Sequence, residues 1–434
     1  MQRFSRRQGL VYGAGGLAAL LASRWFLPAV AHAEAAASLH PGAAGAGGKA
    51  AKAQASKTKA KACIVLWLNG GPSHIDTFDP KSGVATARFK AVKTRSKNLF
   101  VSEHLPLLAD HGDKLAVVRS MTSKEGNHDR ARYLLHTGYV PNPTVHHPSL
   151  GGWVSHEVGE ASPELPNFVS IGGPSLGPGF LGLQHGPFIV DDPAKKPANV
   201  ALPRDVDEAR FRRREEALRS LETRFEPSDP QITGRHAIYE QSTRMMRSPK
   251  LAAFEVEQEP EAVRRAYGDT KFGRGCLAAR RLVESGVKLV EVVLDGWDTH
   301  QDNFERTKKL MSVLDPAFSA LLGDLHARKL LDSTLVVCLG EFGRTPKINA
   351  KEGRDHYPGA WSCALAGGGI RGGIAYGKTD PEGAKVVENP VTVPNLFATL
   401  TTQLGIDPNK VVTSPIGRPI GVTDEGEPVR ALIA

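Results

Sequence analysis

The segment 63–79, CIVLWLNGGPSHIDTFD, decides the fold class of this chain. Its first six residues form a continuous apolar run, which is typical of a strand buried on both faces of a parallel sheet. The run stops at NGGP, where glycine and proline favour a loop. Polar side chains follow, among them His74 and Asp76. The segment therefore predicts a buried strand whose carboxyl end carries groups able to bind a ligand.

Four further apolar runs have the same character, at 115–118, 287–294, 333–339 and 361–366. Between them, apolar residues recur at helical spacing over 304–325 and, in an Arg- and Glu-rich segment, over 211–225. Strands that alternate with helices predict an α/β fold, with a mainly parallel sheet and helices on both faces.

The charge of the chain is unevenly distributed. Of its 434 residues, 41% are hydrophobic and 23% charged, which favours a globular protein over a disordered or fibrous one. The formal charge is +9, but residues 1–33 carry four Arg and no acid, and residues 34–61 carry five Lys and one Glu. Residues 62–434 therefore hold a net charge of only +1, so a nucleic-acid-binding surface is not expected.

The N-terminus has the features of an export signal. The pair Arg6-Arg7 precedes the apolar stretch 9–21, and Ala31-His-Ala33 supplies the small residues that a signal peptidase accepts. We predict a twin-arginine signal peptide at 1–33 and a periplasmic or secreted protein. An uncleaved anchor is the alternative, but Arg24 interrupts the apolar run too early for a span of ~20 residues. No stable membrane span is therefore expected after cleavage.

The rest of the chain divides into a linker and one domain. Residues 34–61, rich in Ala, Gly and Lys, are predicted to form a disordered linker. Residues 62–434 form the domain, in which 141–270 is predicted to be an insertion or cap, because 141–202 is Pro- and Gly-rich and 203–270 is highly charged. The four cysteines contain no CxxC pair. Buried free thiols are favoured, and a disulfide between two of them stays open.

Polar clusters follow the apolar runs. Besides residues 69–79, they are GNHDR at 126–130, DGWDTHQDN at 295–303, GEFGRTP at 340–346 and GRDHYP at 353–358. Because the carboxyl ends of parallel strands meet at one edge of a sheet, these clusters are expected to converge there.

Asp298 and His300 are two residues apart, so on an extended strand both side chains point to the same side. With a third histidine they form a set suited to Zn²⁺ or a similar divalent ion, and Glu341 adds a hard oxygen ligand. In the alternative interpretation, Asp298 caps a helix that starts near Gln301 and His300 packs in a loop.

Two further side chains have open assignments. His128 fits a nucleophile, a general acid or base, a metal ligand or a helix cap. Arg344 fits an anion clamp or an ordinary salt bridge with Glu341.

These motifs, in this order, resemble the alkaline phosphatase and sulfatase superfamily, and more closely an exported, sulfatase-like branch with a domain of unknown function. The segments that carry the resemblance are LNGGPSHIDTFDPK at 68–81, GWDTH at 296–300, GEFGRTP at 340–346 and GRDHYPG at 353–359. The resemblance covers residues from about 62 to about 420. It implies an alkaline-phosphatase-like core and a metal-dependent hydrolase of phosphate or sulfate esters.

The resemblance also implies roles for particular residues. Asp298, His300 and His356 match the ligands of one metal ion, and Glu341 stands where a ligand of a second ion is usual. His128 falls near the nucleophile position, but it replaces the Cys or Ser that formylglycine formation needs, so the ordinary sulfatase mechanism is not expected.

Two departures from the superfamily make a second ion doubtful. Asn69 stands in the place of the usual first-strand acid, for which Asp76 is a possible substitute, and Phe342 replaces a usual histidine.

Our leading hypothesis is an exported metal-dependent hydrolase acting on a small-molecule or polysaccharide ester, with Zn²⁺ as the favoured ion and Ca²⁺ or Mg²⁺ as alternatives. A catalytically inactive member that binds a cell-surface partner or glycan is the second hypothesis. The sequence predicts no oligomeric state. The expected metal ligands are Asp298, His300, His356, Glu341 and Asp76, the expected catalytic residues are His128 and Arg344, and Asn69, His74 and Asp355 are expected to line the site.

Overall fold

The apolar run of the first motif is β1 (Ala62–Asn69), which lies in the middle of a nine-stranded sheet. The computed structural model describes residues 60–222 and 230–434. The predicted signal peptide, and the predicted linker up to residue 59, lie outside these residues. The residues of β1 before Asn69 are all buried, as the apolar run predicted.

The main sheet is mixed and mainly parallel. Only β11 is antiparallel to its neighbours, so the predicted fold class is confirmed, and each predicted apolar run contains a strand. In spatial order the strands are β12 (Ile374–Tyr376), β4 (Leu115–Thr122), β11 (Trp361–Ala366), β8 (Thr334–Leu339), β1, β7 (Leu289–Asp295), β5 (Phe168–Ile171) and β6 (Phe188–Val190), with β15 (Val391–Thr392) also paired to β4.

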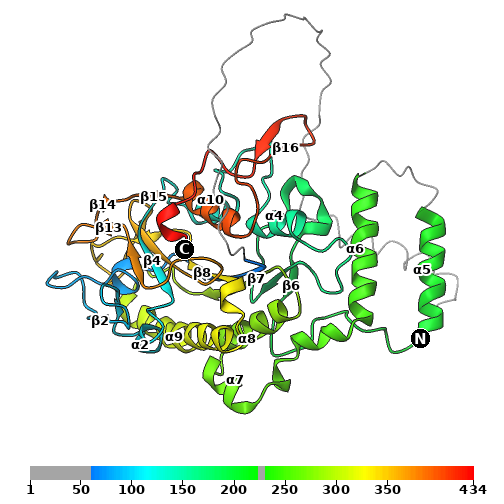
Figure 1. Ribbon diagram of the computed structural model, residues 1–434, viewed down its shortest axis with the longest axis horizontal. Helices are drawn as coiled ribbons and strands as arrows, with labels where there is room; N and C mark the ends of the chain where they lie inside the picture. Colours follow the sequence, from blue (N-terminus) through cyan, green and yellow to red (C-terminus); the bar gives the residue numbers. More distant parts are fainter. Residues whose placement is uncertain (1–59, 223–229) are drawn as a thin grey trace, which may run out of the picture. The chain divides into compact units, whose positions relative to one another are not determined.

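Helices cover both faces of this sheet (Figure 1). One face packs against α3 (His128–Thr137), α4 (Leu150–Glu157) and α10 (Val393–Gln403). The other packs against α8 (Lys271–Glu284) and α9 (Asn303–Ala327), with α2 (Pro106–Ala109) and α7 (Glu261–Tyr267) beside them. The helical spacing predicted over 304–325 corresponds to α9.

The remaining elements are short or peripheral. The strands are β2 (Ala91–Lys93), β3 (Phe100–Ser102), β9 (Gly343–Arg344), β10 (His356–Tyr357), β13 (Lys378–Thr379), β14 (Val386–Glu388), β16 (Val411–Thr413) and β17 (Pro419–Gly421). The 3₁₀ helices are η1 (His74–Asp76), η2 (Gly179–Leu181), η3 (Leu183–His185), η4 (Pro249–Phe254), η5 (Val256–Gln258), η6 (Leu331–Ser333) and η7 (Arg430–Leu432).

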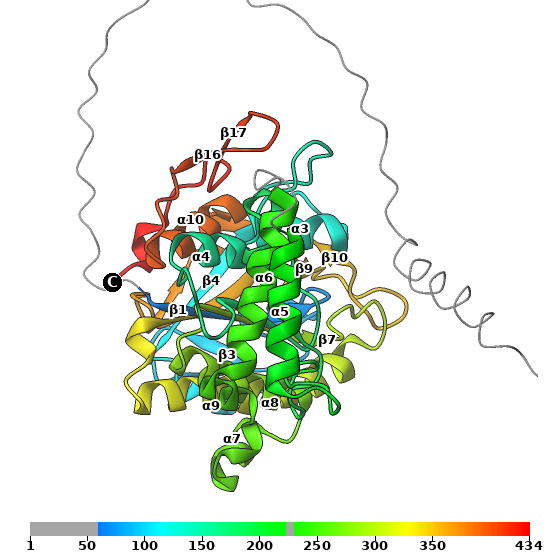
Figure 2. The same cartoon turned by 90° about the vertical axis from the view of Figure 1, so that its right-hand side faces the viewer.

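Part of the segment 141–270, predicted as an insertion or cap, belongs to the core instead. Its strands β5 and β6 extend the main sheet beyond β7, and Trp153 of α4 is fully buried against it. Glycine and proline misled the prediction because they mark the loops around these short elements. Within this segment, the helices α5 (Glu208–Glu222) and α6 (Pro230–Arg247) stand outside the layers, side by side beyond the β6 edge (Figure 2).

All four cysteines are buried free thiols, as predicted. In the part of the chain that the structure describes, no helix is long and apolar enough to cross a bilayer.

Candidate metal centre

The carboxyl ends of β1, β7 and β8 bring their loops together at one edge of the sheet. Asp298 follows β7 by three residues, and Glu341 follows β8 by two. His128 is the first residue of α3, and His356 opens β10, which pairs with β9 (Figure 2). The loop after β1 passes very close: a Cβ added to Gly70, whose φ is +113°, would lie 2.3 Å from the backbone nitrogen of Asp298.

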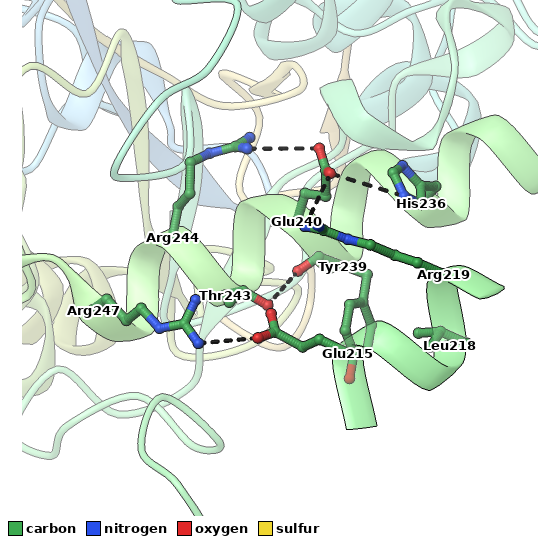
Figure 3. Close-up of a pocket in the computed structure, with 9 residues that line it drawn as sticks. All are labelled: Glu215, Leu218, Arg219, His236, Tyr239, Glu240, Thr243, Arg244 and Arg247. Atoms are coloured by element: carbon green, nitrogen blue, oxygen red, sulfur yellow. Dashed lines mark hydrogen bonds and ion pairs between the residues drawn. The ribbon is translucent and has the colours of Figure 1, made fainter. Parts of the chain in front are cut away.

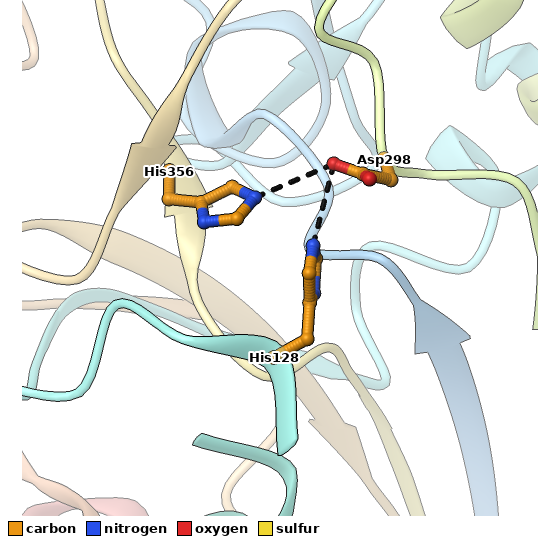
Figure 4. Close-up of side chains that lie close together, drawn as sticks. All are labelled: His128, Asp298 and His356. Atoms are coloured by element: carbon orange, nitrogen blue, oxygen red, sulfur yellow. Dashed lines mark ion pairs between the residues drawn. The ribbon is translucent and has the colours of Figure 1, made fainter. Parts of the chain in front are cut away.

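Three imidazoles converge on one carboxylate oxygen. Oδ1 of Asp298 lies 3.2 Å from Nε2 of His300, 3.4 Å from Nε2 of His128 and 3.5 Å from Nε2 of His356. For His128, Asp298 and His356, the ligand atoms all lie within 4.8 Å of one another (Figure 4). One loop, a hairpin and a helix therefore deliver their side chains to a common point.

The second ring nitrogen of each histidine has its own acceptor. Nδ1 of His128 lies 2.7 Å from Oε1 of Glu341, and Nδ1 of His300 lies 2.8 Å from Oδ1 of Asp355. Nδ1 of His356 lies 2.8 Å from the carbonyl oxygen of Gly126. A carbonyl oxygen can only accept, so Nδ1 of His356 donates and its neutral ring leaves Nε2 with a free lone pair. Such outer partners are typical of metal-binding histidines, whose tautomer they fix.

The short distance between two ring nitrogens favours a bound cation. Nε2 of His300 and Nε2 of His356 are only 2.9 Å apart. If Asp355 and Gly126 hold a proton on each Nδ1, two lone pairs face each other at this distance. The pair is then stable only with a shared proton or a metal ion near both nitrogens.

The carboxylate of the cluster is kept ionised. Burial acts to raise the pKa of Asp298, but the hydrogen bond and charge of Arg344, with the nearby histidines, bring that pKa below its ordinary value. Nη2 of Arg344 donates to Oδ1 of Asp298 over 2.6 Å. A deprotonated carboxylate is the form that binds a metal ion.

The pKa values of His128 and His356 are shifted in opposite directions. The hydrogen bond to Glu341 raises the pKa of His128 above its ordinary value, although partial burial opposes this shift. Burial lowers the pKa of His356, against the effect of its hydrogen bond to Gly126. Of these two rings, His356 thus loses its proton more readily, and His128 holds its proton longer as the pH rises.

Arg344 lies beneath the cluster rather than facing a ligand. Its side chain is 0% exposed, and it also donates to the carbonyl oxygens of Gly70, Gly71 and Arg354. It pairs with Asp298 and not, as the alternative proposed, with Glu341. This placement favours support of Asp298 over the predicted direct contact with a substrate anion.

Glu341 supports the cluster from the other side. Its carboxylate is 1% exposed, accepts from the backbone nitrogen of Gly70 at 2.9 and 3.1 Å, and holds Nδ1 of His128. The resemblance implied a ligand of a second ion here. In the structure, both oxygens of Glu341 are used by Gly70 and His128.

Asp76 and His74 lie apart from the cluster, which corrects two predictions. Asp76 is fully buried and accepts from Nε of Arg354 and Nδ2 of Asn303, both at 2.8 Å, so its charge is spent in a structural ion pair. His74 is buried with Nε2 2.7 Å from the carbonyl oxygen of Gly383. Asp76 was expected to replace the first-strand acid and His74 to line the site, but in η1 both side chains are buried.

The capping alternatives are wrong for both motifs. The side chain of Asn127, not of His128, caps α3 by accepting from the backbone nitrogen of Arg130 at 3.2 Å. The helix after Asp298 begins at Asn303, with Asp302 in the cap position.

A cleft of about 330 Å³ opens beside the cluster, and sequence reasoning missed part of its lining. Asn69 lies there, its Nδ2 donating to Asp295 over 2.8 Å. Arg132 was not singled out, although it follows His128 by one helical turn, a spacing that places both on one face of α3. The cleft is lined by Asn69, Gly70, His128, Asp129, Arg132, Asp295, Gly296, Asp298 and Glu341.

A second pocket, of about 110 Å³, lies between α5 and α6 and contains none of the predicted site residues (Figure 3). Its charged groups neutralise one another: Arg247 binds Glu215 at 3.0 Å, and Arg244 lies 3.7 Å from Glu240. It therefore offers no comparable ligand set.

A family model described as "Protein of unknown function (DUF1501)" matches residues 60–433. The chain belongs to the DUF1501 family. The match spans the sheet and every residue of the histidine cluster, in agreement with the resemblance carried by the motifs.

Solved structures similar to this DUF1501 chain include sulfatases and alkaline phosphatase superfamily members. A sulfatase from Pseudoalteromonas sp. is 12% identical, with a TM-score of 0.39 over 80% of this chain and 68% of that chain. A phosphonate monoester hydrolase from Silicibacter pomeroyi is 11% identical, with a TM-score of 0.34 over 86% and 76%. A protein in the alkaline phosphatase superfamily from Vibrio parahaemolyticus is 10% identical, with a TM-score of 0.34 over 80% and 69%. No curated protein matches the chain.

Proposed function

We propose that this chain is an exported, metal-dependent hydrolase of phosphate or sulfate esters. The observation that carries the proposal is the convergence of three Nε2 atoms on Oδ1 of Asp298 while an acceptor holds each Nδ1. Three imidazole nitrogens and one carboxylate oxygen are a donor set that suits Zn²⁺ better than Ca²⁺ or Mg²⁺, which prefer oxygen ligands.

The charges of the cleft support a bound cation. Among its lining residues, Asp129, Asp295, Asp298 and Glu341 are acids and Arg132 is the single arginine. Such a cleft repels an anionic ester unless a cation lies within it. A divalent ion held by His128, Asp298, His300 and His356 would supply this charge and act as a Lewis acid on the ester oxygen.

Arg132 fits the binding of the ester's anionic group. Among the described residues no carboxylate pairs with it: Nη2 donates to the carbonyl oxygen of Pro174, and Nε is buried without a partner. In this proposal the guanidinium binds a free oxygen of the phosphate or sulfate group from the wall of the cleft.

The proposal assigns the attack on the ester to water. None of the described residues that line the cleft is Ser, Thr or Cys. His128, predicted as a nucleophile or acid–base group, has Nδ1 bound to Glu341 and Nε2 directed at the cluster, which favours the metal-ligand assignment instead. Glu341 then acts by fixing the tautomer of His128.

The deciding experiment combines metal analysis with a panel of aryl phosphate, phosphonate and sulfate esters. We expect stoichiometric metal and turnover of at least one ester class, both lost in His300→Ala. His326→Ala, an exposed histidine of α9, is the matched control and retains both. If the wild-type protein binds no metal and, like His300→Ala, hydrolyses none of the esters, the proposal is contradicted. Full metal occupancy without turnover instead supports the binding-only alternative.

A further inference from the structure

Glu291 is a carboxylate in the middle of the apolar sheet. It lies at the centre of β7, between Val65 of β1 and Ser170 of β5, and is only 2% exposed. Removing a carboxylate from water is costly unless the group is paired and hydrogen-bonded. We therefore expect the acid at this position to make contacts that an apolar residue could not make.

The partners of Glu291 come from two separate segments. Oε2 accepts from Oγ of Ser175 over 2.9 Å and lies 3.1 Å from Nε2 of His136, near the end of α3. Both His136 and Glu291 are shielded from solvent, so this contact is not screened by bulk water. The carboxylate thus joins α3 to the loop 172–178, and both to the central strand.

Both of these connections lead to Arg132. Nδ1 of His136 lies 2.8 Å from the backbone carbonyl oxygen of Arg132, one turn earlier in α3. The second connection runs through the loop 172–178. There Pro174, the residue before Ser175, accepts a hydrogen bond from Nη2 of Arg132 through its carbonyl oxygen. One partner of Glu291, His136, therefore holds the backbone of Arg132, and the residue before the other partner, Ser175, holds the guanidinium of the same arginine.

We propose that Glu291 is the positioning residue for Arg132, aiming its guanidinium into the cleft beside the histidine cluster. The inference rests on the proposed function for the identity of the ligand, an oxyanion of the phosphate or sulfate type. Glu291 itself is buried below the cleft and touches no substrate. It acts through His136, which holds the backbone carbonyl oxygen of Arg132, and through Ser175, whose neighbour Pro174 accepts from the guanidinium.

Oxyanion affinity provides the first test. Inorganic phosphate and sulfate are titrated calorimetrically into the metal-loaded full-length protein. Ser175→Ala removes one anchor and is expected to weaken binding roughly tenfold, about the effect of one lost hydrogen bond. Glu291→Leu, which removes both anchors, weakens binding further, whereas Glu291→Gln retains acceptor oxygen and much of the affinity. Metal content is expected to stay at the wild-type level in all three variants.

The control removes an equivalent hydrogen bond elsewhere. Ser120 is buried in β4 and donates from Oγ to the carbonyl oxygen of Asn389 over 2.6 Å. Ser120→Ala is expected to change thermal stability but not oxyanion affinity. If Ser175→Ala and Ser120→Ala affect both quantities alike, the effect is structural and the positioning proposal is overturned.

Hydrogen exchange separates this proposal from the proposed function. In Glu291→Leu, exchange is expected to rise in α3 and in the loop 172–178 and to stay unchanged in α9. A wild-type protein that binds no oxyanion would contradict the proposed function, and with it the identity of the ligand. Unchanged exchange in both segments of Glu291→Leu would instead overturn the positioning by Glu291, whatever the wild-type protein binds.

Discussion

Each histidine of the cluster is defined by two contacts, one on each ring nitrogen. Nε2 faces Asp298, and Nδ1 faces a carboxylate or a carbonyl oxygen. A loop histidine with a purely structural function needs only one such partner. Three histidines that satisfy both conditions around the same oxygen favour a metal centre over ordinary loop packing.

This arrangement predicts graded losses of metal affinity. His356→Ala removes a donor and is expected to abolish stoichiometric binding of Zn²⁺. Asp355→Ala removes only the outer partner of His300 and is expected to weaken binding by roughly 10- to 100-fold. Competition with a chromophoric chelator measures both effects. Equal affinities of Asp355→Ala and the wild type would show that the contact between His300 and Asp355 does not serve the metal.

The contact between His128 and Glu341 predicts two opposite dependences on pH. In metal-free protein the raised pKa of His128 stabilises the fold at low pH, and this contribution is lost as the pH rises through that pKa. Metal binding has the reverse dependence, because the ion competes with the proton on Nε2. We therefore expect the stabilisation by Zn²⁺ to grow as the pH rises above the ordinary value of 6.5.

Thermal melts with and without Zn²⁺, across pH 5–9 (roughly the range in which histidines titrate), measure both dependences. Glu341→Gln removes the charge that raises the pKa, so both transitions should move to lower pH. Melts of Glu341→Gln with midpoints at the wild-type pH would assign the titration to another group.

The loop after β1 connects the sheet to this chemistry. Gly70 adopts φ +113°, and its backbone nitrogen binds Glu341 while its Cα passes against Asp298. Only glycine fits, because a Cβ would meet the backbone of Asp298 and the conformation is strained for any L-residue. Gly70 thus contacts both the carboxylate of Glu341 and the backbone of Asp298.

Gly70→Ala is expected to destabilise the protein by more than about 1–3 kcal/mol, the usual cost of such backbone strain alone, and to weaken metal binding. Gly83→Ala is the matched control: its φ is +76°, but nothing lies within 4 Å of an added Cβ. The difference between the two variants in urea unfolding isolates the clash with Asp298. Equal losses would show that the close approach does not constrain the site.

Sequence reasoning found the strands and much of the cluster because both leave local patterns. Buried strands are apolar runs, and Asp298 and His300 are only two residues apart in sequence. Arg354, which pairs with Asp76, could not be foreseen, since that contact depends on how two distant loops fold back. Glu291 did leave a local pattern, because it is the single acid in the apolar run 287–294.

The full chain combines four buried thiols with the pair Arg6-Arg7, which is predicted to direct twin-arginine export. Every cysteine is a free thiol inside the folded core, and burial raises the pKa of each of them. A chain that folds before export shields these thiols from oxidation, because thiolate character and access control their reactivity. A chain exported unfolded would expose all four to disulfide formation.

We therefore predict different outcomes for the chain's own leader, its Lys-Lys variant and a leader that exports unfolded chains. With Arg6-Arg7 changed to Lys-Lys, we expect the protein to remain in the cytoplasm. With a leader for unfolded export, we expect it to reach the periplasm with oxidised cysteines and little bound metal. With its own leader, the exported protein should show no reactive thiol before denaturation and all four afterwards, by thiol labelling and mass spectrometry. Equal yield, thiol count and metal content with either leader would contradict folding before export.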